Sequence, residues 1–177
     1  MSTTIQFKYN KGFAYIMTIV LLLLCIVFIL NAYFIKVNTV KSALLFSGFM
    51  PFLFLFYLRK RFFLPALKNE PALELNNNEI IYFIKNQSVP WSNVKSIRQL
   101  TFKNSLGIAV VLVDKNEFMQ DKTALQKAGY FFSNLFYGTP IVISLQYIAG
   151  KDKDILQTVQ KYFEEKQASA GKNTSRL

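Results

Sequence analysis

Residues 12–35 decide the fold, because they read GFAYIMTIVLLLLCIVFILNAYFI, 24 consecutive residues without a charged side chain. At about 1.5 Å per residue, a helix of this length exceeds the roughly 30 Å hydrocarbon core of a bilayer. The stretch therefore predicts a slightly tilted transmembrane helix. A secretory signal peptide is the alternative, but its apolar region is about 7–15 residues long and ends in small residues at a cleavage site, and NAYFIKVNT supplies neither.

A second uncharged run, SALLFSGFMPFLFLFYL, extends from Ser42 to Leu58. Its 17 residues are at the short end of the spanning range, and it contains Pro51. A proline is tolerated in a membrane helix when neighbouring groups satisfy the carbonyl that it frees. We therefore expect residues 12–58 to form a two-span hairpin rather than one span followed by a re-entrant segment.

Basic residues flank the two runs unequally. Two lysines lie between the runs, whereas six basic residues lie outside them: Lys8, Lys11, Arg59, Lys60, Arg61 and Lys68. Since basic residues concentrate on the cytoplasmic side, this bias places both termini in the cytosol. Residues 1–11 are then a cytoplasmic N-terminal segment, and residues 59–70 are a basic juxtamembrane linker.

The chain changes character after the second run. Residues 59–177 contain 17 Lys and Arg and all 10 Asp and Glu, so this part is soluble and moderately basic. Short β-rich stretches separated by turn residues predict five to six strands: residues 72–75, 79–85, 89–91, 94–101, 107–113 and 139–148. The asparagines at 76–78 favour a hairpin between the first two strands.

Two helices are predicted in the same region. Residues 122–136 carry apolar side chains at helical spacing, Asp121 can cap their start, and Gly138 ends them. Residues 154–167 place Ile155, Leu156, Val159, Tyr162 and Phe163 on one face, so this helix should pack across the sheet. Residues 168–177 lack apolar periodicity and are expected to be a disordered tail.

Several short motifs occur in an informative order. They are Pro71, Leu73 and Leu75 in the first strand, Ile80 after the asparagine turn, the sequence WSNV at 91–94, and the sequence GTPI at 138–141. This order resembles the STM3941 family of bacterial membrane proteins. The resemblance implies a membrane α+β protein of the bacterial cytoplasmic (inner) membrane, with a pleckstrin-homology-like domain over residues 71–167. In that domain a bent antiparallel sheet is closed by a C-terminal helix, and no biochemical activity is established for the family.

The residue content excludes most catalytic chemistry. The chain has no histidine, which removes Ser-His-Asp and Cys-His arrangements and histidine metal sites, and it has no GxGxxG, GxxxxGK[ST] or HExxH motif. Its single cysteine, Cys25, lies inside the first apolar run. Carboxylate pairs such as Asp152 and Asp154 lie at element ends or on a polar helix face, where charged residues are usually solvated. We expect no enzyme activity, no cofactor and no metal.

Two candidate contact sites remain. Arg59, Lys60 and Arg61 directly follow the second apolar run and can contact anionic lipid headgroups, or they can act only as a topology determinant. Trp91, the single tryptophan, lies in a turn and can mark a recognition surface, although a buried structural role is the more common use of tryptophan. The aromatic residues at 130–132, 136 and 137 exceed what one helical face needs, so some of them should be exposed or packed on the membrane or a partner, although core packing is favoured.

These observations favour a non-enzymatic interaction module anchored in the lipid bilayer. Its partner is an unidentified protein segment, bound on an exposed sheet edge, or anionic lipid. Nucleic acid is not expected, because the basic residues are scattered and no binding motif accompanies them. The alternatives are a membrane-bound immunity or stress-protection factor and, with less support, a small membrane enzyme that uses paired carboxylates.

Overall fold

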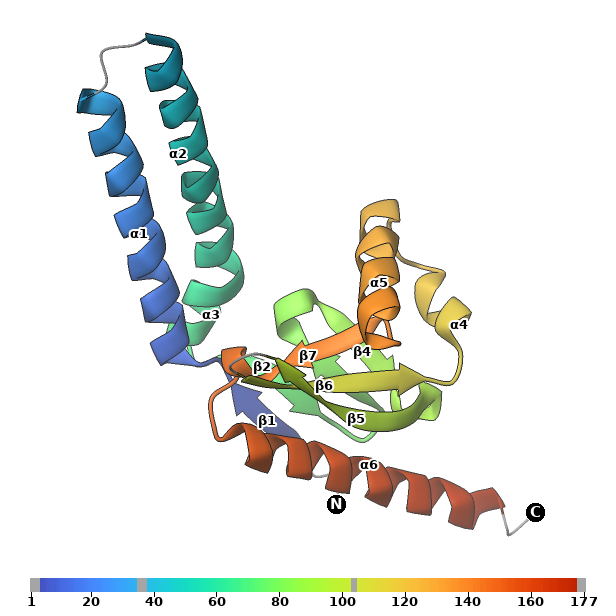
Figure 1. Cartoon of the computed structure of the whole chain (residues 1–177). Coiled ribbons are helices and arrows are strands. Elements are labelled where there is room, and N and C mark those ends of the chain that lie inside the picture. The colour runs from blue at the N-terminus through green and yellow to red at the C-terminus, as the bar shows by residue number, and fades with distance from the viewer. Residues whose placement is uncertain (1–3, 35–37, 103–104, 175–177) are drawn as a thin grey trace. The chain divides into compact units, whose positions relative to one another are not determined.

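A computed structural model describes residues 4–34, 38–102 and 105–174 of the chain (Figure 1). The chain divides into two compact units. One unit comprises Tyr9–Glu70, and the other combines the N-terminal residues up to Lys8 with Pro71–Leu177. The second unit is therefore discontinuous in sequence.

The first unit is helical. It contains α1 (Lys11–Phe34), α2 (Asn38–Leu58), a π-helical turn η1 (Arg59–Phe63) and the short helix α3 (Leu64–Leu67). Among the described helices, α1 is long and apolar enough to cross a membrane, as its sequence predicts. Most of its side chains are exposed, unlike those of a core helix in a soluble protein.

Helices α1 and α2 lie side by side within this unit (Figure 1). Their close approach depends on Gly48, because a Cβ atom at that position would lie 2.9 Å from Cβ of Phe28. Small residues allow this kind of contact between two helices. The buried residues of α1 are Ala14, Leu21 and Ala32.

The second unit contains seven described strands in two antiparallel sheets. The first sheet has the order β1-β2-β3-β4, with strands at Ile5–Lys8, Pro71–Leu75, Glu79–Tyr82 and Gln87–Pro90. The second has the order β5-β6-β7, with strands at Val94–Phe102, Ser105–Leu112 and Ile141–Ser144. The strands from Pro71 onward overlap those predicted from the sequence, although β3 and β7 are shorter than predicted because 3-10 turns follow Tyr82 and Ser144. Strand β1 is an additional one.

Strand β1 precedes α1 in the sequence and pairs with β2, which follows α3. The register joins Ile5 to Leu75 and Lys8 to Pro71. The backbone oxygen of Lys8 also accepts a hydrogen bond of 2.8 Å from the amide of Ala149. The segment that the sequence presented only as a cytoplasmic N-terminal stretch is thus part of the sheet.

The predicted asparagine hairpin is confirmed. The Asn76 side-chain oxygen accepts hydrogen bonds of 2.9 Å from the amides of Asn78 and Glu79, which closes the turn between β2 and β3. This is the local bonding that favours asparagine in turns. In β7, Ile141, Val142 and Ile143 are all buried, as is the following Leu145.

Three helices accompany the sheets: α4 (Lys115–Met119), α5 (Ala124–Tyr137) and α6 (Asp152–Thr174). Helix α5 begins at a capping box formed by Thr123 and Gln126, not at Asp121, and it ends at Gly138, whose φ of 72° suits glycine. Helix α6 continues through part of the stretch predicted as a tail. Its residues Ile155, Leu156, Val159 and Tyr162 are buried, and Phe163 is half-buried, as the periodicity predicted.

The aromatic residues of α5 differ from the prediction. Tyr130 is buried, but Phe131, Phe132, Phe136 and Tyr137 are exposed, so the core packing favoured for this cluster is found for Tyr130 and is wrong for the other four. The reason is that α5 contacts the domain through its more polar side. Figure 1 shows α5 projecting from the sheets, whereas α6 runs along their other side.

Candidate interaction surfaces

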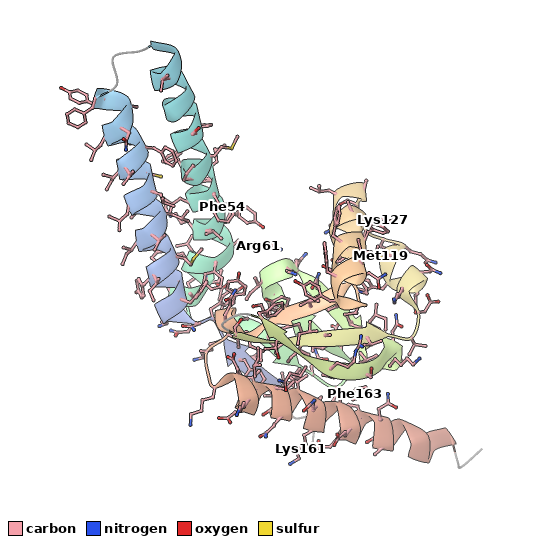
Figure 2. All side chains as sticks on the ribbon, viewed as in Figure 1. Phe54, Arg61, Met119, Lys127, Lys161 and Phe163 are labelled. Atoms are coloured by element: carbon pink, nitrogen blue, oxygen red, sulfur yellow. The ribbon has the colours of Figure 1, made fainter. Side chains whose placement is uncertain are left out.

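The basic residues that follow α2 lie in the π-helical turn η1. Arg59 and Lys60 are exposed, and Arg61, which is labelled in Figure 2, is half-buried. The predicted juxtamembrane linker, residues 59–70, is helical from Arg59 to Leu67. Only the first two basic side chains are thus fully available to an anionic group.

Aromatic contacts hold η1 against the start of α1. The ring of Phe62 lies 5.3 Å from that of Tyr9 and 6.0 Å from that of Phe13, both edge to face. Burial raises the pKa of Tyr9, Arg61 opposes this rise, and the Glu70 carboxylate adds to it. These contacts fix the position of the basic turn within the helical unit.

Trp91 is part of the core rather than an exposed side chain. It begins a short 3-10 turn, Trp91–Asn93, and only 7% of its surface is exposed. Its indole N–H donates a 2.7 Å hydrogen bond to the backbone oxygen of Asn76, and its ring lies 5.5 Å from that of Tyr162 in α6. Trp91 therefore ties the β2–β3 turn to α6.

An open hollow of about 680 Å³ lies beside Trp91. Its lining includes Asn77, Ser92 and Phe163, and Figure 2 shows Phe163 on the side of α6 that faces the sheets. Lys166 forms one wall, donating a 2.8 Å hydrogen bond to Asn77 and placing its ammonium group 5.1 Å from the centre of the Tyr162 ring. Burial raises the pKa of Tyr162, and Glu165 raises it further.

Strand β5 forms one edge of the second sheet and is its longest strand, with nine residues. Its exposed side chains include Lys95 and Arg98. At one end, the backbone oxygen of Val94 accepts a 3.3 Å hydrogen bond from the side chain of Gln167 in α6. At the other end, Thr101 and Phe102 line a second open hollow of about 640 Å³, which includes Asp152 and Asp154. An edge strand offers backbone groups that can pair with a further strand.

A smaller hollow, of about 340 Å³, has Lys85 in its lining together with Ser133, Tyr137 and Ser144. Although much of the Lys85 side chain is exposed, its ammonium group lies 3.5 Å from the backbone oxygen of Val142. Removal of this group from water lowers the pKa of Lys85. No feature of the sequence singled out this lysine, because it depends on a contact between residues 57 positions apart.

The paired carboxylates do not converge on a metal site. Asp152 uses a carboxylate oxygen to accept a 3.0 Å hydrogen bond from the amide of Leu106, and Asp154 is exposed. Glu74 accepts hydrogen bonds from Gln6 and Asn76. Within residues 4–34, 38–102 and 105–174, no group of three or more His, Cys, Asp or Glu side chains is placed to hold a metal ion.

Comparison of the chain with protein-family models, curated proteins and solved structures finds no match. The resemblance drawn from the short motifs in the sequence thus stays a prediction.

Proposed function

We propose that the protein is a membrane-anchored, non-enzymatic interaction module. Residues 12–58 cross the bilayer twice, and the sheet unit on the cytoplasmic side binds an extended segment of a partner protein along β5. The observation that carries the proposal is the pairing of β1 with β2, because these strands lie on either side of the helical unit in the sequence.

This pairing constrains the membrane topology. If α1 crosses a bilayer, the chain must cross it again before Pro71, because β1 and β2 belong to one sheet and so lie on one side. Helix α2 is the other long helix between them. Cleavage of α1 as a signal sequence would also remove β1 and leave the edge of β2 without its partner. The pairing of β1 with β2 therefore favours a two-span hairpin over a signal sequence.

The orientation rests on the flanking charges. Lys8, Lys11, Arg59, Lys60, Arg61 and Lys68 lie on the side of the sheet unit, against Lys36 and Lys41 in the sequence between the helices. This bias favours a cytoplasmic sheet unit. It agrees with the location that the motif resemblance implies.

A pleckstrin-homology-like architecture for the sheet unit is the second part of the proposal. Support comes from two antiparallel sheets of four and three strands and from α6, whose buried face includes Ile155 and Val159. With β1, the described strands number seven, more than the five to six predicted from the sequence. The helices α4 and α5 are inserted between β6 and β7.

The binding mode follows from the length and position of β5. Nine residues can pair with an extended segment, and the side chains of the segment can enter the hollows at either end of the strand. Lys95 and Arg98 discourage pairing between two copies of this edge and favour a segment with acidic residues. The other edge strands, β1, β4 and β7, have four residues each.

Headgroup binding at the basic turn is a second candidate function. The exposure of Arg59 and Lys60 directly after α2 favours it. Each basic residue near an anionic leaflet contributes about 1 kcal/mol. Replacing both with Gln should weaken the association of the protein with anionic lipid, and the loss should shrink in high salt.

The test is site-specific photocrosslinking of the full-length protein in its native membrane, followed by purification in mild detergent and mass spectrometry. A crosslinker at Gln99 in β5 should capture one defined protein. The same crosslinker at Lys161, which Figure 2 shows on the far side of α6 from the sheets, should not. Equal capture at both positions, or enrichment of anionic lipid alone, would contradict binding along β5.

A further inference from the structure

Helix α5 carries an apolar surface that nothing in its own domain covers. Its large exposed side chains are Leu125, Phe131, Phe132, Leu135 and Phe136, with exposed fractions between 57% and 86%. At about 100° per residue they fall within an arc of about 140° around the helix. We call these five residues the α5 apolar face.

The opposite side of α5 holds the helix on the domain. Tyr130 packs edge to face on Phe118 of α4 at 5.2 Å, and the Asn134 side chain accepts a 2.7 Å hydrogen bond from Lys115. Tyr137 packs on Phe102 of β5 at 5.8 Å. The helix thus turns its amide and hydroxyl groups inward and its phenylalanines outward. A surface helix of a soluble domain shows the reverse arrangement.

The charged residues near the α5 apolar face are two lysines and, before the helix, the exposed Asp121. Helix α5 contains no Asp or Glu, and its only charged residue is Lys127, which Figure 2 labels near Met119 of α4. Lys122 lies just before the helix, with its ammonium group 5.0 Å from the centre of the Phe118 ring. Phenylalanine and leucine on one side and lysine at the border are typical of helices that lie in a membrane interface.

The connection to α1 supplies the reason to expect a bilayer at this surface. Strand β1 ends at Lys8 and α1 begins at Lys11, while α3 ends at Leu67 and β2 begins at Pro71. Two short connections therefore tether the domain to a helix that can cross a membrane. A tethered surface meets the bilayer at high effective concentration, whereas a second copy must arrive by diffusion. The apolar face is also a single projecting helix, which suits a lipid surface.

We propose that the α5 apolar face inserts into the headgroup region of the same bilayer that α1 crosses, so that α5 is a second, interfacial attachment of the domain. This inference rests on the membrane anchoring proposed above. Insertion to a depth of about 5–10 Å is usual for such helices. It would limit the rotation of the domain about its tether and fix the direction in which β5 faces.

The test uses the full-length protein reconstituted in lipid vesicles. A small environment-sensitive fluorophore is attached to a single cysteine in a Cys25→Ser chain, either in Phe132→Cys on the apolar face or in Lys127→Cys. These positions are about 140° apart around the helix. Both side chains are exposed, so neither change disturbs the core. Lipids that carry a quencher near the headgroup or deep in the acyl chains report the depth of the probe.

A third sample tests the membrane anchoring by α1 separately from the insertion of α5. The native Cys25, labelled in the otherwise unchanged chain, reports whether α1 lies in the bilayer. We expect deep quenching at Cys25, shallow quenching with a blue shift at Phe132→Cys, and water-like emission at Lys127→Cys.

Water-like emission at Phe132→Cys with deep quenching at Cys25 would overturn the insertion of α5 and leave the anchor intact. Absence of lipid quenching at Cys25 would overturn both. A blue shift at Phe132→Cys without lipid quenching, lost when the protein is diluted in lipid, would show that a second copy covers α5 and would also overturn the inference.

Discussion

Replacement of Trp91 distinguishes a core side chain from a recognition side chain. A suitable host is the sheet unit alone, made by joining Lys8 to Pro71 through an Asn-Gly turn in place of residues 9–70. Lys8 and Pro71 are partners in the β1–β2 register, so a two-residue turn can close the hairpin. The changes are Trp91→Ala and Trp91→Phe, with Ser92→Ala as the control at a neighbouring exposed position.

The expected free-energy changes follow from the contacts of the indole. Trp91→Ala removes a side chain that is 7% exposed and packs on Tyr162 and Phe163, so it should lower the free energy of unfolding by about 3–5 kcal/mol. Trp91→Phe keeps most of the ring packing and loses the 2.7 Å hydrogen bond to Asn76, which is about 1 kcal/mol. Ser92→Ala should change the stability by about 0.5 kcal/mol or less.

Urea unfolding followed by far-ultraviolet circular dichroism measures these differences without relying on tryptophan fluorescence. At a denaturant dependence of about 2 kcal/mol/M, Trp91→Ala should lower the midpoint by about 2 M and Trp91→Phe by about 0.5 M. A cost below about 1 kcal/mol for Trp91→Ala would refute the assignment of Trp91 to the core. Loss of partner binding with unchanged stability would then make it a recognition residue.

Two further predictions use the same host. Within the described residues, the Oε1 atom of Gln87 is buried without a hydrogen-bond partner, so Gln87→Leu should raise the free energy of unfolding by about 1 kcal/mol, and unchanged or lower stability in urea would contradict this. Lys85 has a lowered pKa because its ammonium group is desolvated, so Lys85→Met should be more stable than the wild type near neutral pH. Below the pKa of Lys85 in the folded protein, the folded and unfolded states both hold the proton, so desolvation of the ammonium group lowers the stability of the wild type by its full amount. The stability advantage of Lys85→Met over the wild type should therefore shrink as the pH rises toward 10.5, the ordinary pKa of lysine. An advantage that does not change with pH would contradict this.

The sequence predicted the elements whose signals are local. The long apolar helix, the asparagine turn at Asn76 and the amphipathic face of α6 each follow from residues close together in the chain. Strand β1 was missed because Ile5–Lys8 has only four residues and pairs with a strand more than sixty positions away. A short strand of this kind carries too few alternating residues to indicate its partner.

The candidate surfaces were predicted less completely. Periodicity located α5 but could not tell which of its sides meets the domain, because the packing of Tyr130 and Tyr137 outweighs the apolar pattern. Arg59 and Lys60 are exposed at the predicted position, whereas Trp91 is buried. The hollow at Lys85 had no sequence signal, since its lining comes from distant segments.

The pairing of β1 with β2 around the helical unit is tested most directly by the membrane sidedness of three positions. Single cysteines at Thr4, Asn38 and Lys153 in a Cys25→Ser chain are exposed to a membrane-impermeant maleimide in sealed vesicles of known orientation. We expect Thr4→Cys and Lys153→Cys to react from the cytoplasmic side and Asn38→Cys to react only from the other side. Reaction of Thr4→Cys and Lys153→Cys from opposite sides would mean one crossing between β1 and β2 and would contradict the two-span hairpin.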